Sequence, residues 1–358
     1  MRELLDTMRG WQAEGIGFGR AVAVRTFNSA PRDVGAALLA ADHERIAGSV
    51  SGGCVEGAAA EEVRRARRDG RARVLRYGIS DEMAWDVGLA CGGTIDVLVE
   101  PEVNAATLAA AEATAAGGEA RVLVTRLPSD APGPELGPHA AGTGEKPAEP
   151  IVVDAEGPTP GLLPAAVRTA AADARADSVS RTVAAEGRQW FVEAFAPAPR
   201  LVIVGAVHIA IPLVRIAREM GYRTVLVDRR ATFATRDRFG EADELLVDWP
   251  ERAFERIGLH PRDAVAVLSH DPKLDEPAIV EALRAGCEYV GAIGSRRTQT
   301  ERIERLQAAG LTPGQLDRLH GPIGLDLGGR QPGEIALAIM AEIVAERRGG
   351  TARALAAG

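Results

Sequence analysis

LVIVGAVHIA, residues 201–210, decides the fold of the C-terminal half of the chain. An apolar run ends in a glycine and continues into a helical pattern, as in the first strand, turn and helix of an α/β sheet. The alternation continues downstream, where further buried strands are predicted in TVLVD (224–228), ELLVDW (244–249), AVAVLSH (264–270) and EYVGAIG (288–294). Continuous apolar strands separated by helices predict a Rossmann-like, doubly wound parallel sheet with helices on both faces.

The first turn of this sheet has the layout of a dinucleotide-binding unit, with one departure. Gly205 makes the tight turn, and Asp228 ends the second strand, where it would bind a ribose. The dinucleotide fingerprint requires a second glycine where this chain has Val207, and a β-branched side chain there would obstruct a pyrophosphate. NAD(P) is therefore a candidate cofactor against which Val207 counts.

Polar residues also follow the later strands, at the edge where open α/β sheets bind ligands. His270, Asp271 and Lys273 follow one strand, and they would suit a polar ligand. The alternative is structural, with Asp271 capping the next helix and Pro272 beginning it. The candidate nucleotide or ligand site of this domain comprises Gly205, His208, Asp228, His270, Asp271, Lys273, Gly294 and Arg296.

The preceding sequence predicts a separate α+β domain. APAPR (196–200) favours neither helix nor strand and predicts an interdomain linker. We therefore expect a first domain over residues 1–195, with a flexible insertion at about 127–150, then a Rossmann-like domain over 196–348 and a disordered tail over 349–358. The elements predicted in the first domain are a helix near 3–13, strands near 21–27, 46–50 and 94–100, a helix over 55–69, and a hairpin that turns at Glu186 and Gly187.

The stretch GSVSGGCVEG, residues 48–57, places Cys54 directly after two glycines and before the predicted helix. Unpaired N–H groups and the helix dipole at such a terminus stabilise a thiolate, and they can also bind a phosphate. Gly52 and Gly53 allow a sharp turn and a close approach by a ligand. The alternative is that the glycines only make a turn and Cys54 is a small buried apolar residue.

A second stretch, GLACGGT (88–94), again places a cysteine, Cys91, beside a glycine pair. We do not expect a structural zinc site, because neither CxxC pairs nor regularly spaced histidines accompany Cys54 and Cys91. The third cysteine, Cys287, precedes a buried strand and is expected in the core.

Composition excludes several classes of protein. The 358 residues are enough for two globular domains, and the net charge of −8 argues against a nucleic-acid partner. The N-terminal residues lack an apolar signal core, and no run reaches the roughly 18 apolar residues of a membrane span. Three cysteines suit a reducing compartment, so we expect a cytoplasmic protein.

Five long strings together identify a family. SVSGGCVEG, GLACGGTIDVLVEP, SHDPKLDEPAI, YVGAIGSRRT and HGPIGLDLGGRQPGEIAL, in this order, resemble the xanthine dehydrogenase accessory proteins of the XdhC/CoxI family. The resemblance covers both domains and leaves out chiefly the 127–150 insertion. It implies a chaperone that binds and protects molybdenum cofactor, supports its sulfuration with a cysteine desulfurase and inserts it into a xanthine, aldehyde or CO dehydrogenase-type molybdenum hydroxylase.

The resemblance also implies the residues that would bind the cofactor, which is molybdopterin or its cytosine dinucleotide form. They are Ser51, Gly52, Gly53, Cys54, Glu56, Cys91, Gly92 and Gly93. Cys54 is the candidate for a molybdenum contact, because molybdenum favours soft thiolate ligands. Glu56 could instead favour the first helical turn. A homodimer is expected from the resemblance as well.

Two other functions remain open. In an NAD(P)-dependent oxidoreductase, Cys54 and Cys91 would form a redox pair, and Val207 counts against this reading. In a docking scaffold, the arginine-rich helix would contact a client, which leaves both cysteines unexplained. The family's usual first turn, GAGH, is GAVH here, which keeps His208 but loses a glycine. A non-catalytic maturation factor therefore fits the sequence better than an enzyme does.

Overall fold

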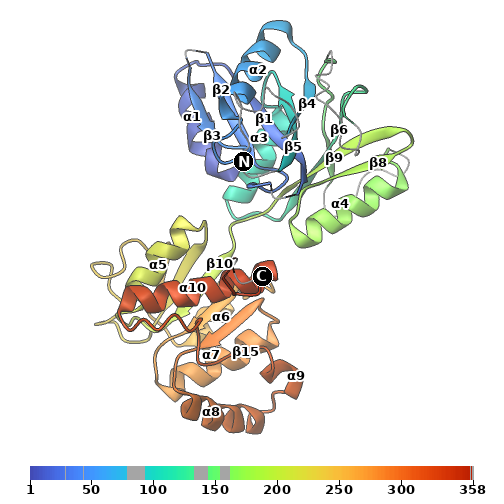
Figure 1. The fold of residues 1–358 in the computed structure, drawn as a ribbon. Helices are drawn as coiled ribbons and strands as arrows, with labels where there is room; N and C mark the ends of the chain where they lie inside the picture. Colours follow the sequence, from blue (N-terminus) through green and yellow to red (C-terminus); the bar gives the residue numbers. More distant parts are fainter. Residues whose placement is uncertain are drawn as a thin grey trace. The chain divides into compact units, whose positions relative to one another are not determined.

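A computed structural model of the protein describes residues 1–28, 30–42, 44–78, 93–132, 144–153, 162–354 and 356. The chain divides into two compact units, Met1–Pro197 and Ala198–Gly358 (Figure 1). Within the described ranges, no helix combines the length and the apolar character needed to cross a membrane.

The first unit contains a five-stranded antiparallel sheet in the order β3-β2-β1-β5-β4. Its strands are β1 (Phe18–Phe27), β2 (Ala37–Ala41), β3 (Ile46–Gly48), β4 (Arg73–Tyr77) and β5 (Thr94–Glu100). Helix α2 (Glu56–Asp69) covers one face, where Ala59 and Val63 pack against strand residues such as Ala21. Val22 and Val24 face the opposite core, as the period-two alternation of a strand requires.

A four-stranded antiparallel sheet, in the order β7-β6-β9-β8, completes this unit. Its strands are β6 (Arg121–Arg126), β7 (Ile151–Val153), β8 (Arg181–Ala185) and β9 (Arg188–Phe195). Helix α4 (Ala165–Asp177) packs on one face. Its other face shares a core with the first sheet, η1 (Arg2–Leu4), α1 (Leu5–Ala13) and α3 (Ala105–Ala115).

The predicted hairpin and the predicted strand near 46–50 have different outcomes. Strands β8 and β9 form the hairpin, and Glu186 and Gly187 both have positive φ values, 51° and 68°, as a tight hairpin turn requires. The other strand ends early, at Gly48, because the φ of this residue is 80° and lies outside the strand region. The residues after Gly48 therefore belong to a loop.

A buried ionic cluster joins the two sheets. Arg20 on β1 donates hydrogen bonds to both carboxylate oxygens of Glu193 on β9, at 2.9 and 3.0 Å, and also pairs with Glu100 on β5. The Arg20 side chain is only 1% exposed. Its charge is therefore stabilised by two carboxylates, and the cluster fixes β9 against β1 and β5.

The second unit is a six-stranded parallel sheet in the order β12-β11-β10-β13-β14-β15, which is the Rossmann strand order. The strands are β10 (Arg200–Val204), β11 (Arg223–Val227), β12 (Glu244–Leu246), β13 (Ala264–Val267), β14 (Tyr289–Ala292) and β15 (Leu319–His320). The predicted parallel sheet is confirmed.

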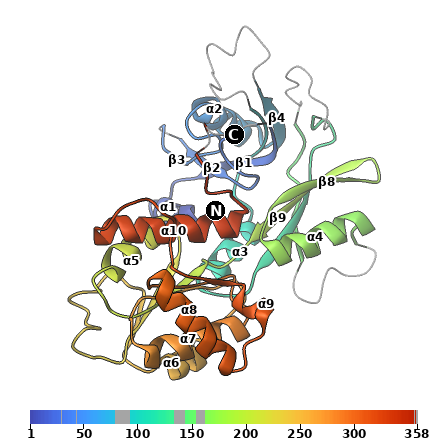
Figure 2. The ribbon, with the colours of Figure 1, turned by 60° about the horizontal axis from the view of Figure 1, so that its bottom comes forward.

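Helices cover both faces of this sheet. Helices α5 (Ala210–Glu219) and α10 (Pro332–Arg348) pack on one face, and α6 (Pro250–Ile257) and α7 (Pro272–Arg284) pack on the other (Figure 2). The chain also contains α8 (Arg296–Ala308) and α9 (Pro313–Leu316) between β14 and β15. Ile339 and Ile343 of α10 are buried in the core.

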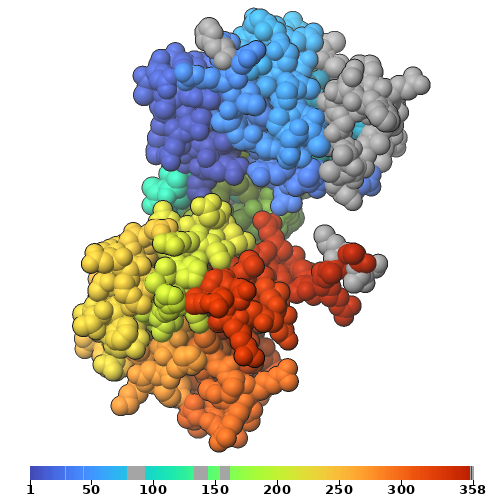
Figure 3. Space-filling model, turned by 60° about the vertical axis from the view of Figure 1, so that its left-hand side comes forward, coloured from blue at the N-terminus to red at the C-terminus, as the bar shows by residue number. Residues whose placement is uncertain are grey.

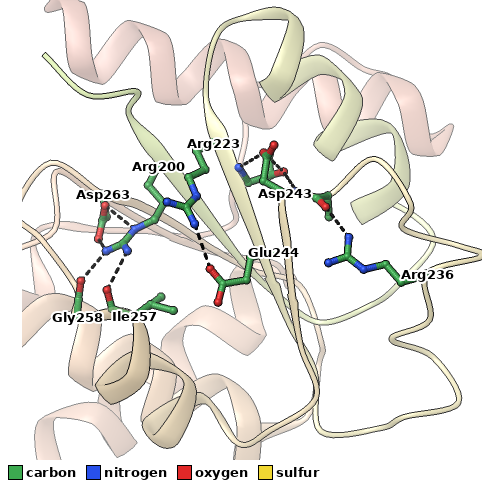
Figure 4. Close-up of polar contacts among 10 residues, drawn as sticks. Arg200, Arg223, Arg236, Asp243, Glu244, Ile257, Gly258 and Asp263 are labelled. Atoms are coloured by element: carbon green, nitrogen blue, oxygen red, sulfur yellow. Dashed lines mark hydrogen bonds and ion pairs between the residues drawn. The ribbon is translucent and has the colours of Figure 1, made fainter. Parts of the chain in front are cut away.

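Charged residues form hydrogen bonds and ion pairs at the end of the sheet where its strands begin, as Figure 4 shows. Arg200, at the start of β10, donates to Asp263 before β13 at 3.0 Å, and to the carbonyl oxygens of Ile257 and Gly258. Arg223, at the start of β11, pairs with Glu244 at the start of β12, at 3.4 Å. These charges are used to join neighbouring strands and loops.

Candidate functional site

The loop between β3 and α2 contains Cys54. Gly52 and Gly53 have φ values of 84° and 122°, which lie in the left-handed region that favours glycine. The predicted sharp turn is therefore present, and α2 begins directly after it at Glu56.

Glu56 folds back into this loop and organises it. One of its carboxylate oxygens accepts hydrogen bonds from the Ser49 hydroxyl at 2.5 Å and from the N–H groups of Val50 and Ser51 at 3.1 and 2.9 Å. The other accepts from the Ser51 hydroxyl at 2.8 Å and from the N–H groups of Gly53 and Val55 at 2.9 and 3.1 Å. Burial raises the pKa of Glu56, but these hydrogen bonds outweigh it and lower the pKa to about 2.

The remaining loop N–H groups also have partners within the loop. That of Gly52 donates to the Ser49 hydroxyl at 2.7 Å, and that of Cys54 donates to the Ser51 hydroxyl at 3.1 Å. These are the backbone N–H groups that the sequence predicted as ligands of a bound anion. In this structure the anion at the start of α2 is the chain's own Glu56 carboxylate, and the buried Ser51 connects it to the backbone of Cys54.

The thiol of Cys54 is free and half-buried beside the hydrophobic cluster under α2. That cluster includes Ile95 of β5, two residues after Gly93, which is buried. Cys91 and Gly92 lie outside the described residues. Cys287 is fully buried, and burial raises the pKa of its thiol to about 12, so this cysteine belongs to the core as expected.

No group of three His, Cys, Asp or Glu side chains with metal-site geometry is found in the part of the chain that the structure describes. Within the described ranges, Cys54 is therefore not part of a preformed metal site.

The carboxyl edge of the parallel sheet brings several predicted residues of the second unit together. Gly205 has φ 112°, and a Cβ at this position would lie 2.9 Å from the nitrogen of Ser269. The loops after β10 and β13 therefore pack closely at the point where the strand order reverses. Val207, in the loop after β10, is partly buried and packs against the core of this unit.

Asp228 is bound within the chain on both of its oxygens. One accepts from the N–H of Ala206 at 2.7 Å and from Nη2 of Arg230 at 2.6 Å. The other accepts from the backbone nitrogen and from Nε of Arg230, both at 2.9 Å. Burial raises the pKa of Asp228, but the hydrogen bonds from Arg230 and Ala206 outweigh it and hold the pKa below its ordinary value.

The other predicted residues of this unit are structural or exposed. Asp271 caps α7 by accepting from the Lys273 nitrogen at 3.0 Å, and Pro272 is the first residue of the helix, as the structural alternative predicted.

His270 has φ 60° and is exposed. The side chains of His208, Lys273 and Arg296 are exposed and have no polar partner among the residues described here. Gly294, φ 152°, precedes Ser295, which caps α8.

Two residues that organise these sites were not predicted from the sequence. Ser49 binds the Glu56 carboxylate, and its signal was its place directly before the predicted loop. Arg230 neutralises Asp228, and its signal was the arginine pair that directly follows the acidic strand end. Both roles depend on side chains that fold back over the backbone, which local sequence patterns do not encode.

Comparison with known proteins finds family matches in both units of the chain. Residues 201–343 match the XdhC Rossmann domain, and residues 11–78 match the XdhC and CoxI family. A Bacillus subtilis (strain 168) protein named as a probable xanthine dehydrogenase subunit is 25% identical, covering 96% of this chain and 97% of its own. The Escherichia coli (strain K12) molybdenum cofactor insertion chaperone PaoD is 27% identical, covering 89% of this chain and 80% of its own.

A solved structure is similar over the full length. The crystal structure of a Bacillus halodurans protein described as a xanthine dehydrogenase has a TM-score of 0.73 and 25% identity, and the match covers 100% of this chain and 97% of that one. The two matched domains lie in different units of the chain, and both carry the family's designation. The chain belongs to the XdhC and CoxI family.

Proposed function

We propose that this protein is a molybdenum cofactor insertion chaperone for a molybdenum hydroxylase of the xanthine dehydrogenase type. Family membership supports the proposal, and so do two relatives that match most of the chain, one named as a molybdenum cofactor insertion chaperone and the other as a xanthine dehydrogenase subunit. In this proposal Cys54 contacts the cofactor, and Gly92 and Gly93 contribute beside Cys91.

The observation that carries the proposal is the loop organised by Glu56. Six hydrogen bonds to one carboxylate fix the backbone around Cys54, so its thiol is presented by a preorganised loop beside two glycines without side chains. A half-buried thiol suits a soft metal centre. The loop N–H groups do not suit the cofactor phosphate, because Glu56 and the two serines already accept from them.

This arrangement favours holding over catalysis. When bound, the cofactor supplies the molybdenum centre that a client enzyme uses. The chain's residues would hold the cofactor through Cys54, and the glycine turn leaves room for its close approach. We further propose that the protein works in the cytoplasm as a homodimer, receives sulfur for the cofactor from a cysteine desulfurase, and passes the cofactor to its client.

The test is to purify the full-length protein from cells that make molybdenum cofactor and to measure bound molybdenum and pterin. The wild type should carry both. Cys54→Ala should lose most of both, because it removes the thiol without removing any of the loop hydrogen bonds described above. Cys287→Ala is the matched control, since this cysteine is buried in the other unit and should leave the bound cofactor unchanged.

Thermal unfolding of each variant separates a lost ligand contact from a lost fold. The proposal is wrong if the folded wild type carries neither molybdenum nor pterin and takes up none of the added cofactor. Tight binding of NAD(P) in that case would favour the oxidoreductase alternative. Equal cofactor content in the wild type and Cys54→Ala would refute only the proposed thiol contact and not the chaperone function.

A further inference from the structure

Arg230 pairs with Asp228 at the carboxyl edge of the parallel sheet and so changes which ligands this edge can bind. Its guanidinium lies side-on to Asp228, with Nε at 2.9 Å from one carboxylate oxygen and Nη2 at 2.6 Å from the other. Asp228 also accepts from the N–H of Ala206 in the first turn, at 2.7 Å. Arg230 therefore reaches from the end of β11 back to the turn after β10, where sheets of this order bind ligands.

This pairing works against a ligand with a free ribose diol. A strand-end carboxylate binds the hydroxyl groups of such a ribose by accepting hydrogen bonds from them. Here both oxygens of Asp228 already accept from Arg230, and its charge is neutralised. The position therefore offers a guanidinium instead of a carboxylate, and it favours a phosphate over a pair of hydroxyl groups.

Arg230 retains the capacity to bind that phosphate. Its side chain is 32% exposed, and Nη1 makes no hydrogen bond to any residue that the structure describes. The pairing with Asp228 orients the guanidinium, so little conformational entropy remains to be lost when a ligand binds. A paired arginine with unused N–H groups is a preorganised phosphate ligand.

An exposed aromatic ring lies against Arg230, and another lies against the preceding Arg229. The Arg230 guanidinium lies 4.5 Å from the ring centre of Phe233, and the Arg229 guanidinium lies 4.7 Å from that of Trp249. Phe233 and Trp249 are 45% and 37% exposed, which is high for large apolar side chains. Arg229 has no carboxylate partner among the described residues. The segment that carries Phe233 and both arginines lies at the surface of this unit, in yellow in Figure 3.

Flat rings and guanidinium planes of this kind stack on nucleobases. Val207 stands in the first turn where the dinucleotide fingerprint has glycine, and this residue type disfavours a pyrophosphate against the backbone there. We propose that this edge binds a nucleotide with a phosphomonoester on its ribose, whose phosphate contacts Arg230 and whose base stacks against Arg229 and Trp249. The site uses only residues of the second unit and does not depend on the molybdenum cofactor proposal.

The test is isothermal titration calorimetry of the full-length protein with adenosine 2′,5′-bisphosphate and with adenosine 5′-monophosphate. The two probes differ only in the ribose phosphate. The bisphosphate should bind at least about tenfold more tightly, the effect expected of a charge-assisted hydrogen bond to arginine. Inorganic phosphate alone should bind more weakly than either nucleotide.

Variants separate the two parts of the site. Arg230→Gln should abolish the preference for the bisphosphate. Trp249→Ala and Arg229→Ala should weaken both nucleotides by several-fold and keep the preference, and both remove exposed side chains, so the fold should survive. Arg223→Ala is the matched control, because it removes an arginine from the opposite end of β11 (Figure 4) and should change neither affinity.

Equal affinity of the wild type for the two nucleotides, or no binding of either at millimolar concentration, would overturn the proposal. So would a preference for the bisphosphate that Arg230→Gln retains. Tight binding of NAD, whose ribose diol is free, would also contradict it. If only Arg230→Gln fails to fold, the Arg229 and Trp249 variants and the wild-type preference still decide the question.

Discussion

At the scale of single residues, Glu56 replaces the bound anion that the start of α2 would otherwise attract. The sequence predicted N–H groups at this helix terminus, and glycines that allow the turn, and both are present. It left two roles open for Glu56, a contact to the pterin and support of the first helical turn. In the structure the carboxylate binds the loop itself. This half-buried carboxylate close to the thiol therefore has a structural role, which is to hold the loop.

Glu56→Gln should destabilise the first unit by about 1 to 3 kcal/mol, the cost of leaving buried donors without acceptors. The carboxamide keeps one acceptor oxygen, and its NH2 group opposes the N–H groups that now bind the second carboxylate oxygen. Urea unfolding at neutral pH, followed by circular dichroism, measures the loss. Glu61→Gln is the control, because Glu61 lies on the same helix, is 61% exposed and makes only surface ion pairs.

The pH dependence of this variant has a definite sign. The pKa of Glu56 falls from 4.5 to about 2 on folding, so its contribution is complete above pH 4.5 and is lost as the pH falls toward 2. The difference between the wild type and Glu56→Gln should therefore shrink in acid. A glutamine variant as stable as Glu61→Gln at neutral pH would show that the loop does not need the carboxylate.

At the scale of elements, a partly buried cluster joins β15 to α10. His320 on β15 stacks on Tyr289 of β14, with ring centres 4.6 Å apart. Glu342 on α10 accepts from the Tyr289 hydroxyl at 2.5 Å and from the Gly324 nitrogen at 2.8 Å, and it lies 3.6 Å from Nδ1 of His320. The nearby Glu342 carboxylate raises the pKa of His320 and outweighs the effect of burial.

This cluster should make the second unit less stable as the pH rises. The folded pKa of His320 lies above 6.5, so its contribution is complete below pH 6.5 and is lost as the pH rises through the folded value. His320→Phe keeps a ring against Tyr289 and should flatten this dependence, with a difference of about 1 kcal/mol or less. Urea midpoints from about pH 5.5 to about pH 8.5 measure it.

Glu342 titrates at lower pH than His320, so the two effects on stability can be measured separately. The pKa of Glu342 is lowered because the nearby His320 and the hydrogen bonds from Tyr289 and Gly324 outweigh its burial, so its contribution is lost only as the pH falls below 4.5. His208→Gln is the control, since the His208 ring is exposed. The pairing has no effect on stability if His320→Phe and the wild type lose stability equally between neutral and alkaline pH.

The same scale shows which elements the sequence could predict. Strands β10 and β13 were predictable because valine and isoleucine dominate short runs that helices separate. Strand β2, with the sequence ALLAA, was not predicted, because alanine and leucine favour helices and only burial on both faces makes this segment a strand. The ion pairs of Arg20 were also beyond prediction, because Glu100 and Glu193 lie far from it in the sequence and meet it only in the folded sheets.

At the scale of the whole molecule, the chain consists of two units, each with its own cores. Three hydrophobic clusters lie in Met1–Pro197, and two lie on the opposite faces of the parallel sheet in Ala198–Gly358. The proposed roles divide in the same way, with the thiol loop in the first unit and the nucleotide edge in the second. Each role should therefore be testable without the other.

A fragment of residues 198–358 should fold alone and unfold in one cooperative transition, because its sheet is closed on both faces by its own helices. Circular dichroism during urea unfolding checks this, and the midpoint should match one of the transitions of the full chain. A fragment that begins at residue 206 is the control: it lacks β10, which pairs with both β11 and β13, and it should not fold. A 198–358 fragment without a cooperative transition would mean that this unit needs the first one for its stability.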